Sequence, residues 1–208
     1  MQIKGVLVVV SGFSGAGKGT VMKALLNKYD NYALSVSATT RNPRPGEENG
    51  REYFFLTESQ FEDMIKNDEL IEHARYVDHY YGTPKKYVEE KMAAGKDVIL
   101  EIEIQGALNI KKKFSDALLV FIVPPTAEDL KKRLTGRGTE SAEVIEKRLR
   151  RAAEESDGMD SYDYIVVNDD VDTCVEDLHS LIRSSHFKES ANTDLVARMK
   201  QELHDMTK

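Results

Sequence analysis

The stretch Gly12-Phe13-Ser14-Gly15-Ala16-Gly17-Lys18-Gly19-Thr20 decides the fold of this chain. It follows the apolar run Val6 to Val10 and precedes a segment with helical apolar spacing. A strand, a glycine-rich turn and a helix in this order predict a phosphate-binding loop. Glycines allow several backbone N–H groups to converge on one anion, and the new helix directs its positive end to the same point. Lys18 supplies a mobile charge for β- and γ-phosphates, so we favour a phosphate site over a glycine-rich turn with a surface lysine.

One position of this loop departs from the general pattern. Gly19 stands where Ser or Thr normally ligates magnesium, and Thr20 follows one residue later. We therefore expect Thr20 to meet Mg2+ either directly or through water. Glu101 is a second candidate for a water-mediated metal contact, because it comes directly after the predicted buried strand 98–100. Ligands of open α/β sheets bind at the carboxyl ends of such strands.

The composition is that of a globular protein. The 208 residues suffice for one domain with insertions, and 40% are hydrophobic and 31% charged. No apolar run approaches the ~20 residues needed to cross a bilayer, and the first residues lack a signal-like pattern. Cys174 is the single cysteine, which fits a reducing compartment, so a cytoplasmic protein without a membrane partner is expected. The net charge of −7 disfavours binding to nucleic acid.

The positions of the arginines are informative, because a polyphosphate ligand needs local positive charge. Arg41 and Arg44 flank a proline in a stiffened loop, which allows two guanidinium groups to face one phosphate. An exposed basic turn explains this loop alone equally well. Arg148 and Arg151 lie three residues apart and share one face of a charged helix. A glycine-containing break precedes that helix, an arrangement typical of a lid that closes over an anionic substrate.

Apolar periodicity predicts alternating strands and helices, which is typical of an α/β fold. Strands are expected at residues 34–37, 53–56, 70–77, 98–100, 118–123 and 164–167. Helices are expected after the phosphate loop, from a capping box at Thr57, after a cap at Thr83 with Pro84 in the first turn, from Ala107, from Thr126, over 142–155, over 171–185 and in the polar tail.

Several separate motifs, in one order along the chain, resemble the guanylate kinases, a family of nucleoside monophosphate kinases. They are the phosphate loop, Ser37 through Tyr53, Ile71-Glu72, Tyr80-Tyr81-Gly82, Gln105-Gly106, Arg137-Gly138-Thr139 and Asn168-Asp169-Asp170. The resemblance covers about residues 5–185. It implies an α/β, three-layer P-loop kinase fold with a parallel sheet core flanked by helices, an inserted GMP-binding subdomain and a helical lid. The single domain 1–208 would have its core at about 1–36, 84–134 and 157–186, the GMP-binding subdomain at about 37–83, the lid at about 135–156 and a helical tail at about 187–208.

The resemblance also implies transfer of the γ-phosphate of ATP to GMP, and to dGMP, with Mg2+ as cofactor and ATP and GMP as small-molecule substrates. The implied ATP-binding residues are Gly12, Phe13, Ser14, Gly15, Ala16, Gly17, Lys18, Gly19, Thr20, Arg137 and Asn168. The implied catalytic residues are Lys18, Arg41, Arg133, Arg137 and Arg148, with Arg151 as a further candidate. The implied GMP-binding residues are Ser37, Arg41, Arg44, Tyr53, Glu72, Tyr81, Gly82, Thr83, Glu103 and Gly106. Family members commonly have Asp where this chain has Glu103, which leaves the contact of Glu103 open.

Two other functions are possible for such a sequence: a noncatalytic scaffold and a kinase for another monophosphate. Domains that resemble guanylate kinases also serve as noncatalytic peptide-binding scaffolds, but the intact Gly17-Lys18 pair and the loop arginines favour an enzyme. A kinase for another monophosphate is disfavoured by Glu72, because one carboxylate can accept from both N1–H and the exocyclic amine of guanine. The oligomeric state is left open.

Overall fold

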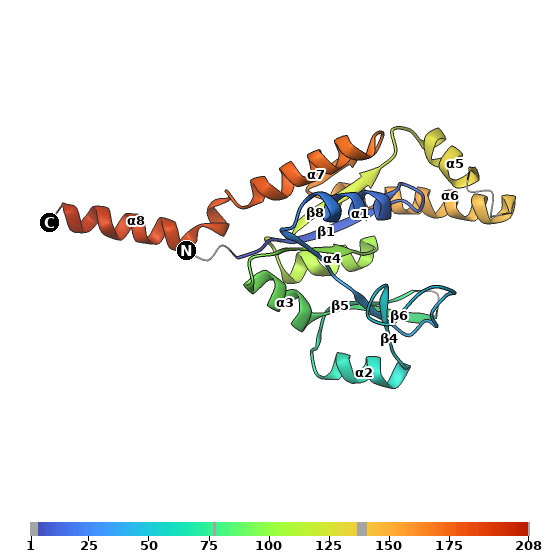
Figure 1. Ribbon diagram of the computed structural model, residues 1–208, viewed down its shortest axis with the longest axis horizontal. Coiled ribbons are helices and arrows are strands. Elements are labelled where there is room, and N and C mark those ends of the chain that lie inside the picture. The colour runs from blue at the N-terminus through green and yellow to red at the C-terminus, as the bar shows by residue number, and fades with distance from the viewer. Residues whose placement is uncertain (1–3, 77, 137–140, 208) are drawn as a thin grey trace.

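The computed structural model describes residues 4–76, 78–136 and 141–207, and its centre is a parallel five-stranded sheet flanked by helices (Figure 1). The strand order is β2-β7-β1-β8-β9. Val8, Val9 and Val10 of the central strand pair with β7 on one side and β8 on the other. The strands are β1 (Leu7–Gly12), β2 (Tyr32–Leu34), β7 (Asp97–Glu101), β8 (Leu118–Val123) and β9 (Tyr164–Val167).

Alternating residues of β1 build two halves of the core, because neighbouring side chains of a strand point to opposite faces. Val8 and Val10 are buried with residues of α1 and α7, whereas Leu7 and Val9 are buried with residues of α3 and α4. These helices are α1 (Lys18–Lys28), α3 (Lys85–Ala93), α4 (Ile104–Lys113) and α7 (Val171–Ser185). The predicted layers, a parallel sheet with helices on both faces, are confirmed.

A second sheet is formed by residues 37–84 and lies below the first in Figure 1. Its order is β4-β3-β6-β5, with β3 and β4 parallel and the other pairs antiparallel. The strands are β3 (Ser37–Thr39), β4 (Tyr53–Phe55), β5 (Leu70–Tyr76) and β6 (His79–Pro84). Helix α2 (Glu58–Lys66) covers one face through Phe61 and begins with the predicted capping box of Thr57 and Gln60. The other face is left for polar side chains.

Several predicted boundaries differ from the structure. The strand expected at 34–37 is divided between β2 and β3, because the chain passes there from one sheet to the other. The helix expected from Ala107 begins at Ile104. The predicted cap at Thr83 is wrong: Thr83 lies in β6, and Pro84 occupies the N-cap position of α3. Since Thr83 stands opposite Glu72 in the ladder, its hydroxyl donates to Glu72 Oε1 at 2.8 Å instead of capping the helix.

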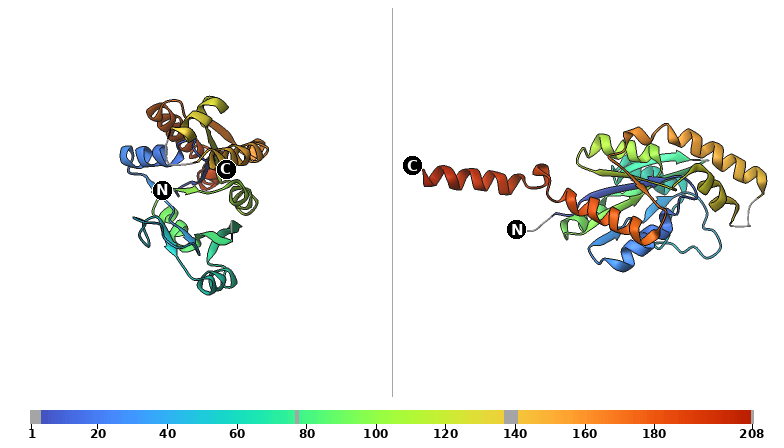
Figure 2. Two further views of the ribbon diagram at one scale, coloured as in Figure 1. Left: turned by 90° about the vertical axis from the view of Figure 1, so that its right-hand side faces the viewer. Right: turned by 90° about the horizontal axis from the view of Figure 1, so that it is seen from above.

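Three further helices lie outside these layers. Helices α5 (Ala127–Thr135) and α6 (Ala142–Ser156) pack together through Leu130, Leu134 and Ala152, next to Phe13 of the phosphate loop. Helix α8 (Thr193–Met206) extends away from the rest of the chain (Figure 2). Short 3-10 turns occur at Met159–Ser161 and Glu189–Ala191. No helix among the described residues is long and apolar enough to cross a membrane.

Candidate active site

The turn between β1 and α1 has the backbone of an anion-binding loop. Gly12, Gly15 and Gly17 have φ values of +154°, +96° and +90°, which side chains with a Cβ atom rarely allow. Lys18 is the first residue of α1, and its Nζ donates to the carbonyl oxygens of Gly12 at 2.6 Å and Phe13 at 3.2 Å. The ammonium group therefore curls back over the loop that would hold the phosphates.

Two predicted site residues brace this loop from behind. Asn168, which is 3% exposed, donates from Nδ2 to Ala16 O at 2.7 Å. Arg133 donates from Nη1 to the same Ala16 oxygen at 3.3 Å and from Nη2 to Asn168 O at 2.7 Å. A Cβ atom on Gly17 would stand 2.5 Å from Asn168 Nδ2, so only glycine fits beneath this amide. Both side chains thus fix the loop backbone, and the contacts with adenine and phosphate that the family resemblance implied for them stay a prediction.

A cavity of about 360 Å3 opens over the loop. It is lined by Phe13, Ser14, Gly15, Gly17, Lys18, Gly19, Thr20, Glu101 and Arg148. Arg148 reaches in from α6 and donates to Ser14 Oγ from Nη2 at 2.8 Å and from Nε at 3.2 Å. Burial lowers the pKa of Lys18, while the charges of Glu101, Glu103 and Glu155 oppose that shift. The cavity therefore combines two cationic side chains with backbone N–H groups, which suits a polyphosphate.

The same cavity contains both candidate metal contacts, Thr20 and Glu101. Among the described residues, no group of three or more His, Cys, Asp or Glu side chains could hold a metal ion by itself. Mg2+ in kinase sites is usually held by one or two protein oxygens together with substrate phosphates and waters. A hydroxyl and a carboxylate beside a phosphate loop therefore fit this ion.

Glu72 is a buried residue of the second sheet, and its carboxylate lies next to α4. It is 4% exposed, accepts from the Thr83 hydroxyl, and has its Oε2 so near Gly106 that an added Cβ there would stand 2.9 Å away. Burial raises the pKa of Glu72 to about 7, against the opposing effects of the Thr83 hydrogen bond and of Lys113. The structure thus brings Glu72, Thr83 and Gly106 together, as predicted for a base-binding pocket.

Two predicted phosphate-binding residues, Arg41 and Tyr53, lie together on the second sheet. The Arg41 guanidinium stands 5.3 Å from the centroid of the Tyr53 ring, and this ring is 6.1 Å from that of Tyr81. Burial, Tyr81 and Glu101 all raise the pKa of Tyr53, while Arg41 lowers it. Arg44 is exposed at the edge of the group, and Ser37 is half-buried in β3.

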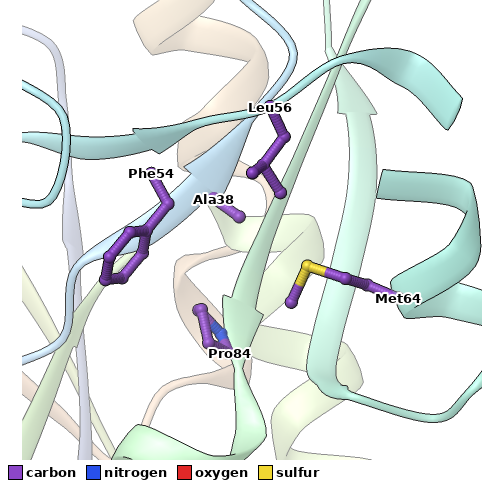
Figure 3. Close-up of a pocket in the computed structure, with 5 residues that line it drawn as sticks. All are labelled: Ala38, Phe54, Leu56, Met64 and Pro84. Carbon is purple, nitrogen blue, oxygen red and sulfur yellow. The ribbon is translucent and has the colours of Figure 1, made fainter. Parts of the chain in front are cut away.

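The opposite face of the second sheet holds an apolar cavity of about 280 Å3 (Figure 3). It is lined by Ala38, Phe54, Leu56, Met64 and Pro84. Because side chains alternate along a strand, Ala38 and Phe54 point away from the face that carries Ser37 and Tyr53. With neither charge nor a strong donor in its lining, this cavity does not suit a phosphate.

The remaining predicted residues that the structure describes lie in β6, in α6 and at the N-cap of α4. Glu103 is the N-cap residue of α4, and its Oε2 is 4.0 Å from Arg151 Nη2. Arg151 also donates to Glu155 Oε1 at 3.0 Å. Gly82 is buried in β6 against Glu72 O. Arg137 lies outside the described residues.

Two contacts of the site were missed in the sequence. Glu47 accepts from both Nη atoms of Arg41, and Lys113 donates from Nζ to Ile71 O beside Glu72. The signal for Glu47 was an acidic residue within a basic loop, three residues after Arg44. The signal for Lys113 was weak, since a lysine run at a helix end is ordinarily explained by the helix dipole.

Comparison with known proteins agrees with this geometry. The guanylate kinase family model matches residues 4–185. The chain is 48% identical over 204 residues to a guanylate kinase of Caldanaerobacter subterraneus subsp. tengcongensis, and the alignment covers 97% of this chain and 99% of the relative. It is 50% identical over 188 residues to a guanylate kinase of Lactococcus lactis subsp. lactis, with 90% and 92% covered. The crystal structure of a guanylate kinase from Anaplasma phagocytophilum superposes with a TM-score of 0.73 at 32% identity, over 90% of this chain and 89% of the other. The chain therefore belongs to the guanylate kinase family and is an enzyme that phosphorylates GMP with ATP.

Proposed function

We propose that ATP binds with its phosphates in the loop Gly12–Thr20 and that GMP binds on the second sheet, with guanine at Glu72 and phosphate at Arg41. One observation carries this proposal: the Glu72 carboxylate lies against Gly106, the third residue of α4, which follows β7. Glu101 ends β7 and lines the cavity over the phosphate loop. Glu72 and the phosphate-loop cavity therefore lie near the same edge of the large sheet, where ligands of open α/β sheets bind.

Glu72 suits guanine for a simple chemical reason. Guanine presents its ring N1–H and its exocyclic amine side by side, and a carboxylate accepts both. Adenine has an unprotonated ring nitrogen at the first position, which would face carboxylate lone pairs with no proton between them. The Thr83 hydroxyl holds Oε1 in place, so the carboxylate is already oriented before the base arrives. We assign Ser37, Gly82, Gly106 and Glu103 to the rim of this base site.

The transfer step needs alignment and positive charge more than covalent chemistry. The acceptor is the phosphate of GMP, which is already an anion, so no strong general base is required. Repulsion between two polyanions is the main obstacle, and Lys18 and Arg148 supply cations on the ATP side. Arg41, Arg44, Tyr53 and Tyr81 would hold the acceptor phosphate, and Arg137 would act from the lid. Closure of α6 over the cavity would exclude water and prevent hydrolysis of ATP.

Thr20 and Glu101 would hold Mg2+, directly or through water. The ion would supply charge neutralisation between the phosphates when it is bound. We further propose that the enzyme acts in purine nucleotide metabolism in the cytoplasm, which the single cysteine supports. We expect dGMP to be accepted too, because the residues assigned here address the base and the phosphate.

A coupled assay of ADP formation tests these assignments. ATP is offered with GMP, dGMP, AMP, CMP or UMP, each in the presence of Mg2+ and again with excess chelator. We expect kcat/KM for GMP to exceed that for AMP by at least about 100-fold, because a mismatched base leaves the buried carboxylate unpaired. Comparable turnover of AMP would contradict the role of Glu72, and full activity with chelator would contradict the metal assignment.

A further inference from the structure

Glu47 grips the arginine that we assign to the acceptor phosphate. Its Oε2 accepts from Arg41 Nη1 at 2.9 Å and its Oε1 accepts from Arg41 Nη2 at 3.0 Å. The pair is shielded from solvent, since the Arg41 and Glu47 side chains are only 13% and 18% exposed. Other ion pairs of the same loop, such as Arg51 with Glu48, are 53% and 70% exposed. Two parallel hydrogen bonds in a shielded place fix the plane of the guanidinium.

Glu47 also shapes the loop that carries the second arginine. Its Oε2 accepts from the backbone N–H of Arg44 at 2.7 Å, and its own N–H donates to Arg44 O at 3.0 Å. Arg41 Nη1 closes the turn further by donating to Asn42 O at 2.7 Å. Hydrogen bonds to Arg41 and to the Arg44 backbone lower the pKa of Glu47, so it stays charged. One carboxylate thus sets both the side chain of Arg41 and the backbone position of Arg44.

The contacts with Glu47 do not occupy all hydrogen-bond donors of Arg41. A guanidinium has five N–H donors; the contacts with Glu47 and Asn42 involve three of them, and Tyr81 is a further hydrogen-bond partner, which leaves at least one donor. On another side, the guanidinium lies over the rings of Tyr53 and Phe55, at 5.3 Å and 5.7 Å from their centroids. Arg41 is therefore held between a carboxylate and two aromatic rings while at least one donor remains for an incoming anion.

We propose that Glu47 is a positioning residue for the acceptor phosphate, because it holds Arg41 and the Arg44 backbone in the binding geometry before GMP arrives. The inference rests on the proposed role of Arg41 and Arg44 in binding that phosphate. A preformed site avoids ordering two long side chains on binding, which raises affinity. The opposite possibility is that Glu47 competes with the phosphate for Arg41. The two accounts predict opposite changes in GMP affinity when Glu47 is removed.

The first experiment compares Glu47→Ala and Glu47→Gln with the wild type in steady-state kinetics at saturating ATP. We expect Glu47→Ala to raise KM for GMP about tenfold, because preorganisation is lost, with kcat and KM for ATP within about twofold. Glu47→Gln keeps one acceptor oxygen for Arg41, so its KM for GMP should lie between those of the wild type and Glu47→Ala. Glu48→Gln is the matched control, since Glu48 is the neighbouring residue and pairs with Arg51 in solvent. It should behave as the wild type.

A double-mutant cycle then asks whether Glu47 acts through Arg41. In an Arg41→Ala background, Glu47→Ala should change KM for GMP by less than about threefold, because residues that act through one contact are not additive. A full tenfold effect in that background would overturn positioning through Arg41 and assign the effect to the Arg44 backbone, whereas an unchanged KM in the single variant would overturn the positioning role altogether. A lower KM for GMP in Glu47→Ala would instead establish competition. If Arg41→Ala alone leaves KM for GMP unchanged, the assigned phosphate site fails and the inference falls with it. Thermal unfolding of each variant, Glu47→Gln included, separates these results from misfolding.

Discussion

The phosphate loop and the second sheet are held in shape by different parts of the chain. In the loop, three glycines with positive φ set the backbone, and Asn168 and Arg133 fix it through a single carbonyl oxygen, that of Ala16. On the second sheet the shape comes from side-chain pairs: Thr83 holds Glu72, and Glu47 holds Arg41. The site that we propose for ATP is therefore shaped by the path of the backbone, whereas the site that we propose for GMP depends on individual carboxylates. Substitutions should affect the two sides separately, and in different ways.

The largest effect is expected on the ATP side. Lys18→Ala should lower kcat at least about 100-fold, because charge stabilisation of the transition state by such a group is worth roughly 3 kcal/mol. The fold should persist, since the loop backbone is set by glycines and by Asn168. Turnover and the circular dichroism spectrum are compared with those of Lys23→Ala, an exposed residue of the same helix. Near-normal turnover in Lys18→Ala would remove the catalytic role of the loop.

The next effect is expected on the GMP side. Glu72→Gln should lower kcat/KM for GMP by about 10- to 100-fold, because the amide turns one acceptor into a donor facing guanine. The preference for GMP over AMP should narrow, and KM for ATP should stay the same. The control is Glu69→Gln, because Glu69 is exposed and directly precedes β5, the strand that carries Glu72. An unchanged ratio of GMP to AMP would mean that another residue reads guanine.

A smaller and graded effect is expected from pH. The pKa of Glu72 is raised to about 7, so acidification protonates the carboxylate in the free enzyme. Because guanine needs the charged form, kcat/KM for GMP should fall as pH decreases through about 7, approaching tenfold per pH unit. The phosphate of GMP titrates near pH 6 as well, so Glu72→Gln is measured in parallel. The fall of kcat/KM near pH 7 should be absent in Glu72→Gln. If the fall persisted in this variant, a group other than Glu72 would be responsible for it.

The smallest effect is expected from the C-terminal helix. Leu203 and Met206 of α8 are 57% and 82% exposed, and the helix extends away from both sites (Figure 2). Deletion of residues 193–208 should leave kcat and both KM values within about twofold, because the helix contacts neither pocket. Steady-state kinetics are combined with light scattering to compare the assembly state. Lost turnover in a folded variant of unchanged assembly would reveal a role for α8 in catalysis.

The same comparison explains what could be predicted from the sequence. The phosphate loop, the strands 118–123 and 164–167 and the capping box at Thr57 were predicted correctly, because local periodicity and turn chemistry determine them. Thr83 was predicted as a helix cap because its partner, Glu72, is eleven residues away on another strand. Glu47 was missed for a similar reason, since nothing in the local pattern says which arginine a loop carboxylate will hold. Contacts between segments are decided by packing, and only the family resemblance anticipated that Glu72, Thr83 and Gly106 lie together.

Separate binding measurements on the two sides test the central claim most directly. Isothermal titration calorimetry of wild type, Lys18→Ala and Glu72→Gln is carried out with ATP alone and with GMP alone. The account predicts that Lys18→Ala weakens ATP binding and leaves the Kd for GMP within about twofold, and that Glu72→Gln does the reverse, because the two pockets use different residues. If either variant weakened binding of the other side's nucleotide as strongly as its own, the assignment of ATP to the loop and GMP to the second sheet would be contradicted.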